Sequence, residues 1–429
     1  MSINTNLYAK MQGMKGDKMK FNMFQFLHAI YVFQDLVEKE LFGQATNNYA
    51  RVIYVSLKMG RILKLSDYEI LDLLFLALLR DNGMSAKEIF ETHYQSVSTG
   101  LIPMTISREH CIRGEDNLQR FPFFSNPQNV IMYHHEHYDG TGVFGMKGEN
   151  IPLMSQIIFL ASNIDSVYNF DLVAKDPAIK DSMKEYVKNN KSKLFSEKIT
   201  ESFLRLANDD MFWNVFLNHE ISNAVKKETA TYNFDFTFSK IREMTSIFSR
   251  ITDMSSSFTT KHSATLARNM EQMIQFYKFD EDHRQKLLIA SDLHDIGKLG
   301  IHPAILEKKG SLTKNEFVVI QRHPLIGYKS INQIKGLKDV AKWILNHHEK
   351  CDGSGYPRGL FDEDLDFESK LLGCLDIYTA LREDRSYRPE MTQEEAFIIL
   401  FDMANRNLID KGICEDIKHV FYKLPNQTV

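Results

Sequence analysis

The side chains with the clearest chemical potential are histidines and aspartates in the C-terminal half of the chain. They occur as a single histidine, a His-Asp pair, another single histidine, a His-His pair and an aspartate: His262, His294, Asp295, His323, His347, His348 and Asp376. All are imidazole or carboxylate donors and none is a thiolate, a mixture that suits iron, manganese or zinc in an open catalytic site better than a closed structural zinc site. Each piece alone is a weak signal, and their joint order favours a metal site. Because one carboxylate, most naturally Asp295, can bridge two cations that activate a water as hydroxide, we predict a binuclear centre that hydrolyses phosphate esters.

The elements that must position these side chains are helices. Apolar residues recur at i, i+3, i+4 and i+7 over long stretches, and glycine and proline are confined to joints such as DGTG and DGSGYP. This pattern predicts an all-α fold of helical bundles.

The chain also repeats itself. Residues 48–83 align without a gap with residues 262–297, and His134-His135-Glu136 aligns with residues 347–349 after a slip of one position. In both copies a single histidine, His110 or His323, precedes the His-His pair by 24 residues. We therefore predict two tandem bundles of one fold. Their expected boundaries are a tail at 1–20, an N-terminal copy at 21–232 and a C-terminal copy at 233–429.

Composition excludes several classes of protein. The 429 residues are 43% apolar and 25% charged, as in an ordinary soluble protein of two or three domains. The net charge of −4 gives no broad basic field for a nucleic acid polymer or an anionic membrane. No apolar run approaches the ~20 residues of a membrane span, and four dispersed cysteines suit a reducing compartment. We therefore expect a cytoplasmic protein.

Three segments of the C-terminal copy resemble a known family. HDIGK (294–298), HHEKCDGSGYPRGL (347–360) and LDIYTALREDRSYR (375–388) are similar to the HD-GYP phosphodiesterases, a branch of the HD metal-dependent phosphohydrolases. The resemblance implies a tandem pair of HD-type bundles. It also implies hydrolysis of a bacterial cyclic dinucleotide, cyclic di-GMP or 3′,3′-cyclic GMP-AMP, to a linear product by a hydroxide that bridges the metals.

The resemblance also assigns roles to residues. It makes the seven histidines and aspartates above the ligands of two divalent ions, iron or manganese by analogy, with nickel and zinc as alternatives. Lys298 would face the scissile phosphate and stabilise charge on it, and Arg385 would hold a phosphate through its planar guanidinium. The loop residues Gly355, Tyr356 and Pro357 would contribute to substrate recognition, although a purely structural loop is an equal alternative.

Two departures from the family pattern refine this prediction. Phe258 stands where trinuclear members have a glutamate, so we expect a binuclear site and a reaction that stops at the linear dinucleotide. Thr379 replaces the usual second aspartate after Asp376, a change that we expect to lie outside the ligand shell.

The N-terminal copy keeps only part of the pattern. It retains His110, His134 and His135, and also Asp81. The other equivalents are changed: Asn48 for the first histidine, Arg80 for the histidine of the HD pair, Met84 for the lysine, Asn163 for the last aspartate and Val143-Phe144 for Tyr-Pro. Since an arginine cannot bind a metal and its cation repels one, we predict no catalysis in this copy. A scaffold or regulatory role, and a weak site for one metal, stay open.

Other functions are compatible with the sequence. One is a receptor that binds a cyclic dinucleotide without hydrolysing it, and another is an HD hydrolase of a different nucleotide. We expect the two copies to contact each other, and the sequence leaves open whether whole chains form a homodimer.

Overall fold

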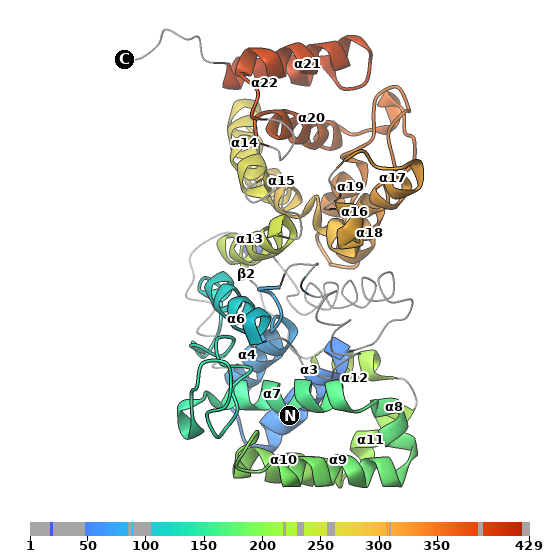
Figure 1. The fold of residues 1–429 in the computed structure, drawn as a ribbon. Coiled ribbons are helices and arrows are strands. Elements are labelled where there is room, and N and C mark those ends of the chain that lie inside the picture. Colours follow the sequence, from blue (N-terminus) through green and yellow to red (C-terminus); the bar gives the residue numbers. More distant parts are fainter. Residues whose placement is uncertain are drawn as a thin grey trace, which may run out of the picture. The chain divides into compact units, whose positions relative to one another are not determined.

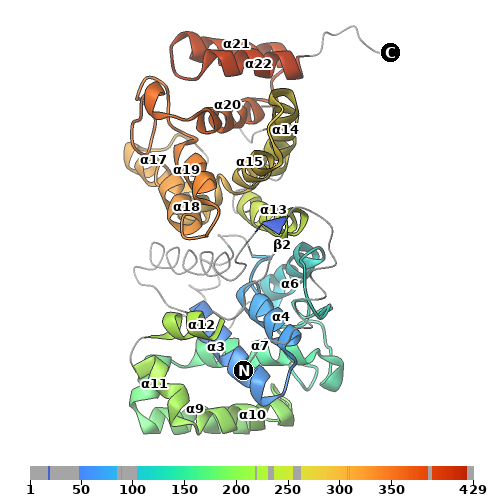
Figure 2. The same cartoon turned by 180° about the vertical axis from the view of Figure 1, so that it is seen from behind.

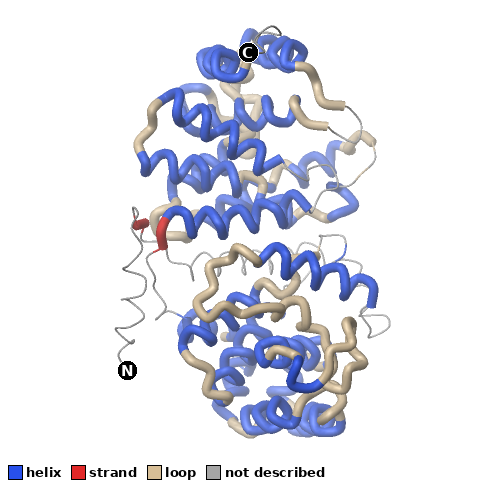
Figure 3. Tube along the Cα trace, turned by 90° about the vertical axis from the view of Figure 1, so that its left-hand side faces the viewer, coloured by secondary structure: helices blue, strands red, loops and turns tan. Residues whose placement is uncertain are grey.

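The computed structural model describes residues 18–19, 48–84, 88, 104–217, 220–229, 236–254, 262–306, 308, 310–384 and 389–422. The regular secondary structure of this part of the chain is helical apart from two short strands, β1 (Lys18–Met19) and β2 (Phe236–Thr237), which pair antiparallel (Figure 3). The chain divides into two compact units, one of residues 30–233 and one of residues 1–29 with 234–429. None of the described helices is both long and apolar enough to cross a bilayer.

The unit of residues 30–233 is built around α3, which packs against α4 and α7 (Figure 1). Its elements are α3 (Asn48–Ile62), α4 (Asp67–Leu78), α6 (Met104–Leu118), η1 (Gly148–Asn150), α7 (Leu153–Val167), α8 (Phe170–Lys175), α9 (Pro177–Asn189), α10 (Glu197–Ala207), α11 (Asp210–Leu217) and α12 (Ile221–Thr229). Helices α9 and α10 are as long as α21 and α22 of the other copy and follow α7 in the same order, whereas the described part of that copy has no counterpart of α8, α11 or α12. Helices α8 and α11 share an aromatic core in which Phe170, Phe212, Trp213 and Phe216 are at most 2% exposed.

The other unit is built around α15, which packs against α13, α14, α19 and α20. Its helices are α13 (Phe238–Met254), α14 (His262–Tyr277), α15 (Glu281–Leu293), η2 (Ile296–Gly300), α16 (Pro303–Leu306), α17 (Lys314–Ile320), α18 (His323–Ile331), α19 (Lys338–Asn346), η3 (Asp362–Asp364), α20 (Phe367–Leu381), α21 (Gln393–Asn405) and α22 (Lys411–Phe421). Figure 2 shows α21 and α22 side by side at the end of this unit, where both pack against α20.

The sequence repeat corresponds to repeated helices. Helices α3 and α14 begin at aligned positions, as do α4 and α15, and α7 and α20 are both 15 residues long. The start of the second helix is also marked alike, because Ser66 caps α4 and Asp280 caps α15, each by accepting a hydrogen bond from a backbone N–H three residues on. Similar local signals therefore set the same helices in both copies.

Candidate metal centre

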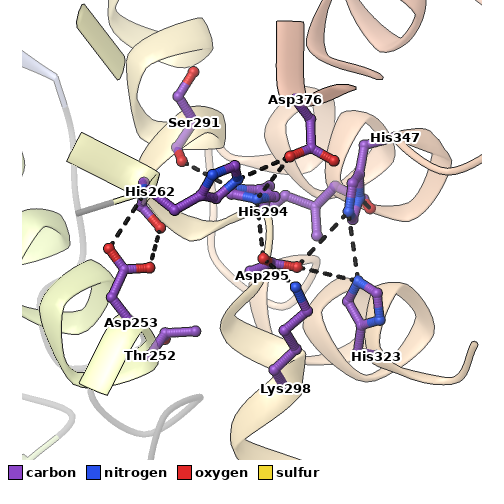
Figure 4. A network of polar contacts seen from close by, with 12 residues as sticks. Thr252, Asp253, His262, Ser291, His294, Asp295, Lys298, His323, His347 and Asp376 are labelled. Carbon is purple, nitrogen blue, oxygen red and sulfur yellow. Dashed lines mark hydrogen bonds and ion pairs between the residues drawn. The ribbon is translucent and has the colours of Figure 1, made fainter. Parts of the chain in front are cut away.

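The seven predicted ligands sit mainly at helix ends of the C-terminal copy. His262 begins α14, the His294-Asp295 pair follows α15, His323 begins α18, and the His347-His348 pair follows α19. Asp376 alone projects from the middle of a helix, α20. Figure 4 shows the side chains from these separate segments converging on one another.

Two glycines allow this convergence. A Cβ added to Gly297 would lie 1.9 Å from the carbonyl oxygen of His323, and one added to Gly373 would lie 2.6 Å from that of His347. Both distances are well inside van der Waals contact, so only glycine lets η2 approach α18 and α20 approach the His-His turn.

The seven side chains form two groups of possible ligands. In the first ligand group, Asp295, His323, His347 and His348 each offer one donor atom within 4.8 Å of the others. In the second ligand group, His262, His294 and Asp376 do the same. The structure therefore brings together the full predicted set and divides it into two groups of donor atoms, each of which could hold a metal ion.

Asp295 lies between the two groups. Its Oδ1 is 3.2 Å from Nε2 of His323 in the first ligand group, and its Oδ2 is 3.2 Å from Nε2 of His294 in the second. Since one carboxylate faces both groups with different oxygens, its position fits the bridging role that the family resemblance implies.

Hydrogen bonds to the backbone orient three of the histidines. Nδ1 of His294 is 3.0 Å from the Ser291 carbonyl, and Nδ1 of His323 and His347 lies 2.8 and 2.6 Å from the carbonyls three residues before them. A carbonyl oxygen only accepts, so Nδ1 must carry the hydrogen that it donates. Each ring is thereby assigned the tautomer whose Nε2 lone pair faces the site, as in metal-binding histidines.

His262 is held between two carboxylates. Its Nε2 is 2.8 Å from Oδ1 of Asp376, and its Nδ1 is 2.8 Å from Oε2 of Glu383. Burial acts to lower the pKa of His262, but the hydrogen bonds to these carboxylates outweigh it and raise the pKa to about 10. The proton on Nε2 thus occupies the position that a cation would take, with Glu383 behind the ring to orient it.

Glu383 was not among the residues predicted for the site. It lies seven residues after Asp376, just beyond the end of α20, and the spacing of two helical turns is the signal that could have placed both residues on one side of that helix.

Burial and mutual repulsion keep histidines of the first ligand group neutral. Burial, with the nearby His294 and His323, lowers the pKa of His347 to about 3. Burial also lowers the pKa of His348 well below its ordinary value, with His347 as the next cause. Because a neutral imidazole is the form that binds metal, these residues need not lose a proton first.

Two polar atoms at the centre of the site support a cation here. His294 Nε2 and Asp295 Oδ1 are fully buried and have no hydrogen bond of adequate geometry. Buried polar atoms in proteins are otherwise almost always satisfied. Imidazole and carboxylate donors without a thiolate suit Fe²⁺, Mn²⁺ or Zn²⁺, so the residues present fit a pair of divalent ions.

Lys298 lies next to the carboxylate between the groups. It projects from η2, and its ammonium donates a hydrogen bond of 2.5 Å to Asp295 Oδ2 while the side chain stays 27% exposed. The lysine therefore reaches the ligand set and also faces solvent.

The Gly-Tyr-Pro loop packs against the same ligand set. The ring of Tyr356 lies 4.9 Å from that of His348 between centroids. A Cβ on Gly355 would lie 2.3 Å from the backbone nitrogen of Lys350, so the loop closes tightly at this point, just before Pro357. The predicted substrate residue Arg385 and the departure at Phe258 lie outside the described residues.

Glu349 fixes the end of this loop. Its carboxylate accepts hydrogen bonds from the backbone nitrogens of Arg358 at 2.7 Å and Leu360 at 3.0 Å. In the N-terminal copy Glu136 does the same for Phe144 and Met146. No role was predicted for this glutamate, although both copies carry it directly after the His-His pair.

The N-terminal copy keeps the histidine geometry of the first ligand group. Nε2 of His110 is 3.4 Å from Nε2 of His134, the same separation as between His323 and His347. Ring centroids of the two adjacent histidines are 4.0 Å apart in both copies.

The equivalent of the second ligand group is replaced by a buried arginine. Arg80 is 4% exposed; its guanidinium donates to Asn48 Oδ1, lies 3.2 Å from Asp81 Oδ2 and covers the ring of Tyr49 at 4.4 Å. A fixed cation thus replaces the histidine of the HD pair, in the manner predicted from the sequence.

The predicted match between Asn163 and Asp376 is wrong by one residue. Helix α7 and helix α20 start 214 positions apart, at Leu153 and Phe367, whereas the two His-His pairs are 213 apart. Ser162 is therefore the structural equivalent of Asp376, and Asn163 instead accepts a hydrogen bond from the Tyr186 hydroxyl at 2.9 Å. The loop between the His-His pair and the helix is one residue shorter in this copy, which the ungapped comparison did not detect.

Comparison with known proteins places both copies in one family. Residues 31–196 and 246–413 each match the family model described as HD domain. The chain is 25% identical over 381 residues to a 3′3′-cGAMP-specific phosphodiesterase 1 of Vibrio cholerae serotype O1, which covers 86% of each chain. It is 36% identical over 128 residues, 29% of this chain and 34% of the other, to a cyclic di-GMP phosphodiesterase response regulator of Xanthomonas campestris pv. campestris.

A solved structure has the same fold. The crystal structure of a cyclic GMP-AMP specific phosphodiesterase of V. cholerae matches with a TM-score of 0.58 and 23% identity, over 93% of this chain and 98% of that chain. These findings confirm the predicted all-α fold with two HD-type bundles and the resemblance described above.

Proposed function

The chain belongs to the HD-domain family, and from that premise we propose that it is a metal-dependent phosphodiesterase that hydrolyses a bacterial cyclic dinucleotide to a linear dinucleotide. The position of Asp295 carries the proposal. Its two carboxylate oxygens face two separate groups of histidine donors, an arrangement that suits a pair of cations better than one.

We assign seven residues to holding the metals. Asp295, His323, His347 and His348 would hold one ion, and His262, His294 and Asp376 would hold the other, shared through Asp295. When bound, two divalent cations supply Lewis acidity to a phosphate ester and bring the pKa of a water toward neutrality. We propose that the two ions are iron or manganese.

The remaining roles belong to side chains around this set. Lys298, close to Asp295 and partly exposed, is placed to stabilise negative charge on the phosphate oxygens in the transition state. We propose that Arg385 holds a phosphate. The Gly355-Tyr356-Pro357 loop, packed on His348, would form one wall of the substrate site.

The favoured substrate is 3′,3′-cyclic GMP-AMP. A relative that spans both copies, with 86% of each chain aligned, is named for that dinucleotide, whereas the Xanthomonas relative named for cyclic di-GMP aligns over only 29% of this chain. With Phe258 in place of a glutamate ligand, we propose that the product stays a linear dinucleotide.

The proposal also covers the organisation of the chain. Residues 1–20 form a tail, residues 21–232 a non-catalytic copy with a scaffold or regulatory role, and residues 233–429 the catalytic copy. We propose that the two copies contact each other, with a homodimer of whole chains as a further possibility. The described cysteines Cys111, Cys351, Cys374 and Cys414 are all free thiols, in keeping with a cytoplasmic location.

The test is product analysis with matched substrates. Full-length protein, purified anaerobically and loaded with Fe²⁺ or Mn²⁺, is incubated with 3′,3′-cyclic GMP-AMP or cyclic di-GMP, and products are separated by chromatography. Asp295→Asn is the control, because it keeps the shape of the side chain and removes its charge. We expect a linear dinucleotide, faster from 3′,3′-cyclic GMP-AMP, and no product from the control.

Two other outcomes would replace the proposal. Intact dinucleotides in the presence of metal-loaded protein that binds them would indicate a receptor. Intact dinucleotides without binding, together with hydrolysis of another nucleotide, would indicate an HD hydrolase of a different substrate.

A further inference from the structure

A second cluster of metal-binding side chains lies in the N-terminal copy. His110, Cys111, His134 and His135 each offer one donor atom, and these atoms lie within 4.8 Å of one another. We name them the N-terminal cluster. Its histidines are equivalent to those of the first ligand group, but its fourth member is a thiol.

The spacing of the donor atoms suits a tetrahedral ion. Nitrogen ligands about 2.0–2.1 Å from a tetrahedral zinc lie about 3.3 Å apart, and a nitrogen and a sulfur ligand lie about 3.6 Å apart. In the N-terminal cluster the His110 and His134 Nε2 atoms are 3.4 Å apart, and Cys111 Sγ is 3.9 Å from His110 Nε2 and 3.7 Å from Nδ1 of His134. Because the donor atoms all lie within 4.8 Å of one another, an ion could enter once the thiol turns toward Nε2 of His134.

The rings of the cluster are oriented for binding. Nδ1 of His134 is 2.6 Å from the carbonyl of Ile131, which assigns the hydrogen to Nδ1 and leaves Nε2 as the donor facing His110. Within the described part of the chain, neither ring nitrogen of His135 takes part in a hydrogen bond. This histidine therefore has a nitrogen available for an ion.

The thiol takes over from the aspartate used in the other copy. Asp81, the equivalent of Asp295, is paired with the Arg80 guanidinium at 3.2 Å. Cys111 follows His110 directly, is 0% exposed and is not in a disulfide. The aligned residue of the C-terminal copy is Pro324, which cannot bind a metal, so the thiol is particular to the N-terminal cluster.

We propose that the N-terminal cluster binds one divalent ion of borderline softness, Zn²⁺ or Fe²⁺, through Cys111, His110, His134 and His135. Four protein ligands close the coordination shell, as in structural zinc sites, and the buried Arg80 fills the position of a second ion. The site would thus stabilise the fold of this copy without activating water. The proposal does not depend on the activity of the C-terminal copy.

The test is metal analysis and cobalt spectroscopy of the full-length chain. We expect three metal ions per chain by mass spectrometry, falling to two in Cys111→Ser and in His135→Ala. In cobalt-loaded protein we expect a sulfur-to-Co²⁺ charge-transfer band in the near ultraviolet. Because the ligands assigned in the C-terminal copy include no thiolate, this band reports the N-terminal cluster alone.

The controls separate this site from the catalytic centre and from misfolding. Cys414→Ser removes an equally buried thiol and should keep the band and the third ion. Asp295→Asn should keep the band whatever it does to activity. If Cys111→Ser does not fold, as judged by circular dichroism, the test rests on the cobalt spectrum of the wild-type protein and on the metal content of His135→Ala. Two ions per chain and no thiolate band in the wild-type protein would overturn the proposal.

Discussion

The two copies of the bundle are alike on one side of the metal centre and different on the other. On the shared side, the first two histidines have an Nε2–Nε2 separation of 3.4 Å in both copies, and the adjacent histidine rings have a centroid separation of 4.0 Å in both. On the other side, His262, His294 and Asp376 correspond to Asn48, Arg80 and Ser162. The N-terminal copy thus keeps the histidines of one group of donors and lacks the donors of the other group.

The N-terminal copy shows how the fold tolerates the loss of these donors. Where the C-terminal copy gathers donors for a cation, the N-terminal copy inserts the guanidinium of Arg80, which pairs with Asp81 and hydrogen-bonds Asn48. Its buried charge is thereby compensated, as a charge inside a protein must be. The equal histidine spacing also indicates that the backbone, through glycines such as Gly83 and Gly297, positions these rings in both copies.

The largest expected effect comes from giving the C-terminal copy the arginine of the other. His294→Arg removes a donor of the second ligand group and places a guanidinium cation where the metal ion should bind. Because a metal contributes several kcal/mol to transition-state stabilisation, we expect kcat/KM to fall at least about 10³-fold and metal content to fall by one ion per chain.

The reverse substitution is the matched control. Arg80→His restores one histidine, but Asn48 and Ser162 still stand where the C-terminal copy has the other two donors of the second ligand group. We therefore expect the activity to change less than about twofold. If His294→Arg kept its rate and metal content while folded, the assignment of His294 as a ligand would be wrong.

Lysine 298 provides the next comparison, because Met84 stands at the equivalent position. Lys298→Met leaves the seven donors in place and removes only the ammonium beside Asp295. We expect kcat to fall about 10²-fold with an unchanged metal content, as when one stabilising donor is removed from a transition state. Steady-state kinetics and metal analysis check this. The control is the reverse substitution in the N-terminal copy, Met84→Lys, which should leave kcat unchanged. A raised KM with normal kcat would instead assign Lys298 to substrate binding.

The contrast between the copies also shows what sequence could and could not predict. Type and order of residues were enough to predict the helical fold, the repeat and a set of seven histidines and aspartates that the fold gathers, because these residues follow one another in a characteristic order. Glu383 was missed since a glutamate beyond a helix end has no motif, and its role exists only through contact with His262, 121 residues earlier. Cys111 was taken as one of four dispersed cysteines, and only the fold places it among three histidines.

Glu383 leads to a smaller expected effect. Glu383→Gln keeps the size of the side chain but weakens the hydrogen bond that orients His262 and supports its basicity. Losing such a partner typically costs 10–100-fold in metal affinity, so we expect the Mn²⁺ concentration for half-maximal activity to rise by about that factor. Saturating metal should restore most of kcat. Glu390 is an exposed glutamate, and Glu390→Gln should leave the metal titration unchanged. Equal titrations for the two variants would show that Glu383 does not support metal binding.

The smallest effect on activity is expected where the copies are most alike, at the glutamate that closes the loop. Glu349 and Glu136 each accept two backbone hydrogen bonds with low exposure, and a glutamine amide nitrogen cannot accept, so each Glu→Gln variant leaves one donor poorly satisfied. We expect each substitution to lower the free energy of unfolding of its own unit by about 1–2 kcal/mol, seen by calorimetry as a fall of a few degrees in Tm. Only Glu349→Gln should also lower kcat/KM, by less than about tenfold, because only its loop carries Tyr356 against a ligand histidine. If Glu136→Gln lowered activity as much, the N-terminal loop would have a part in catalysis that its sequence does not indicate.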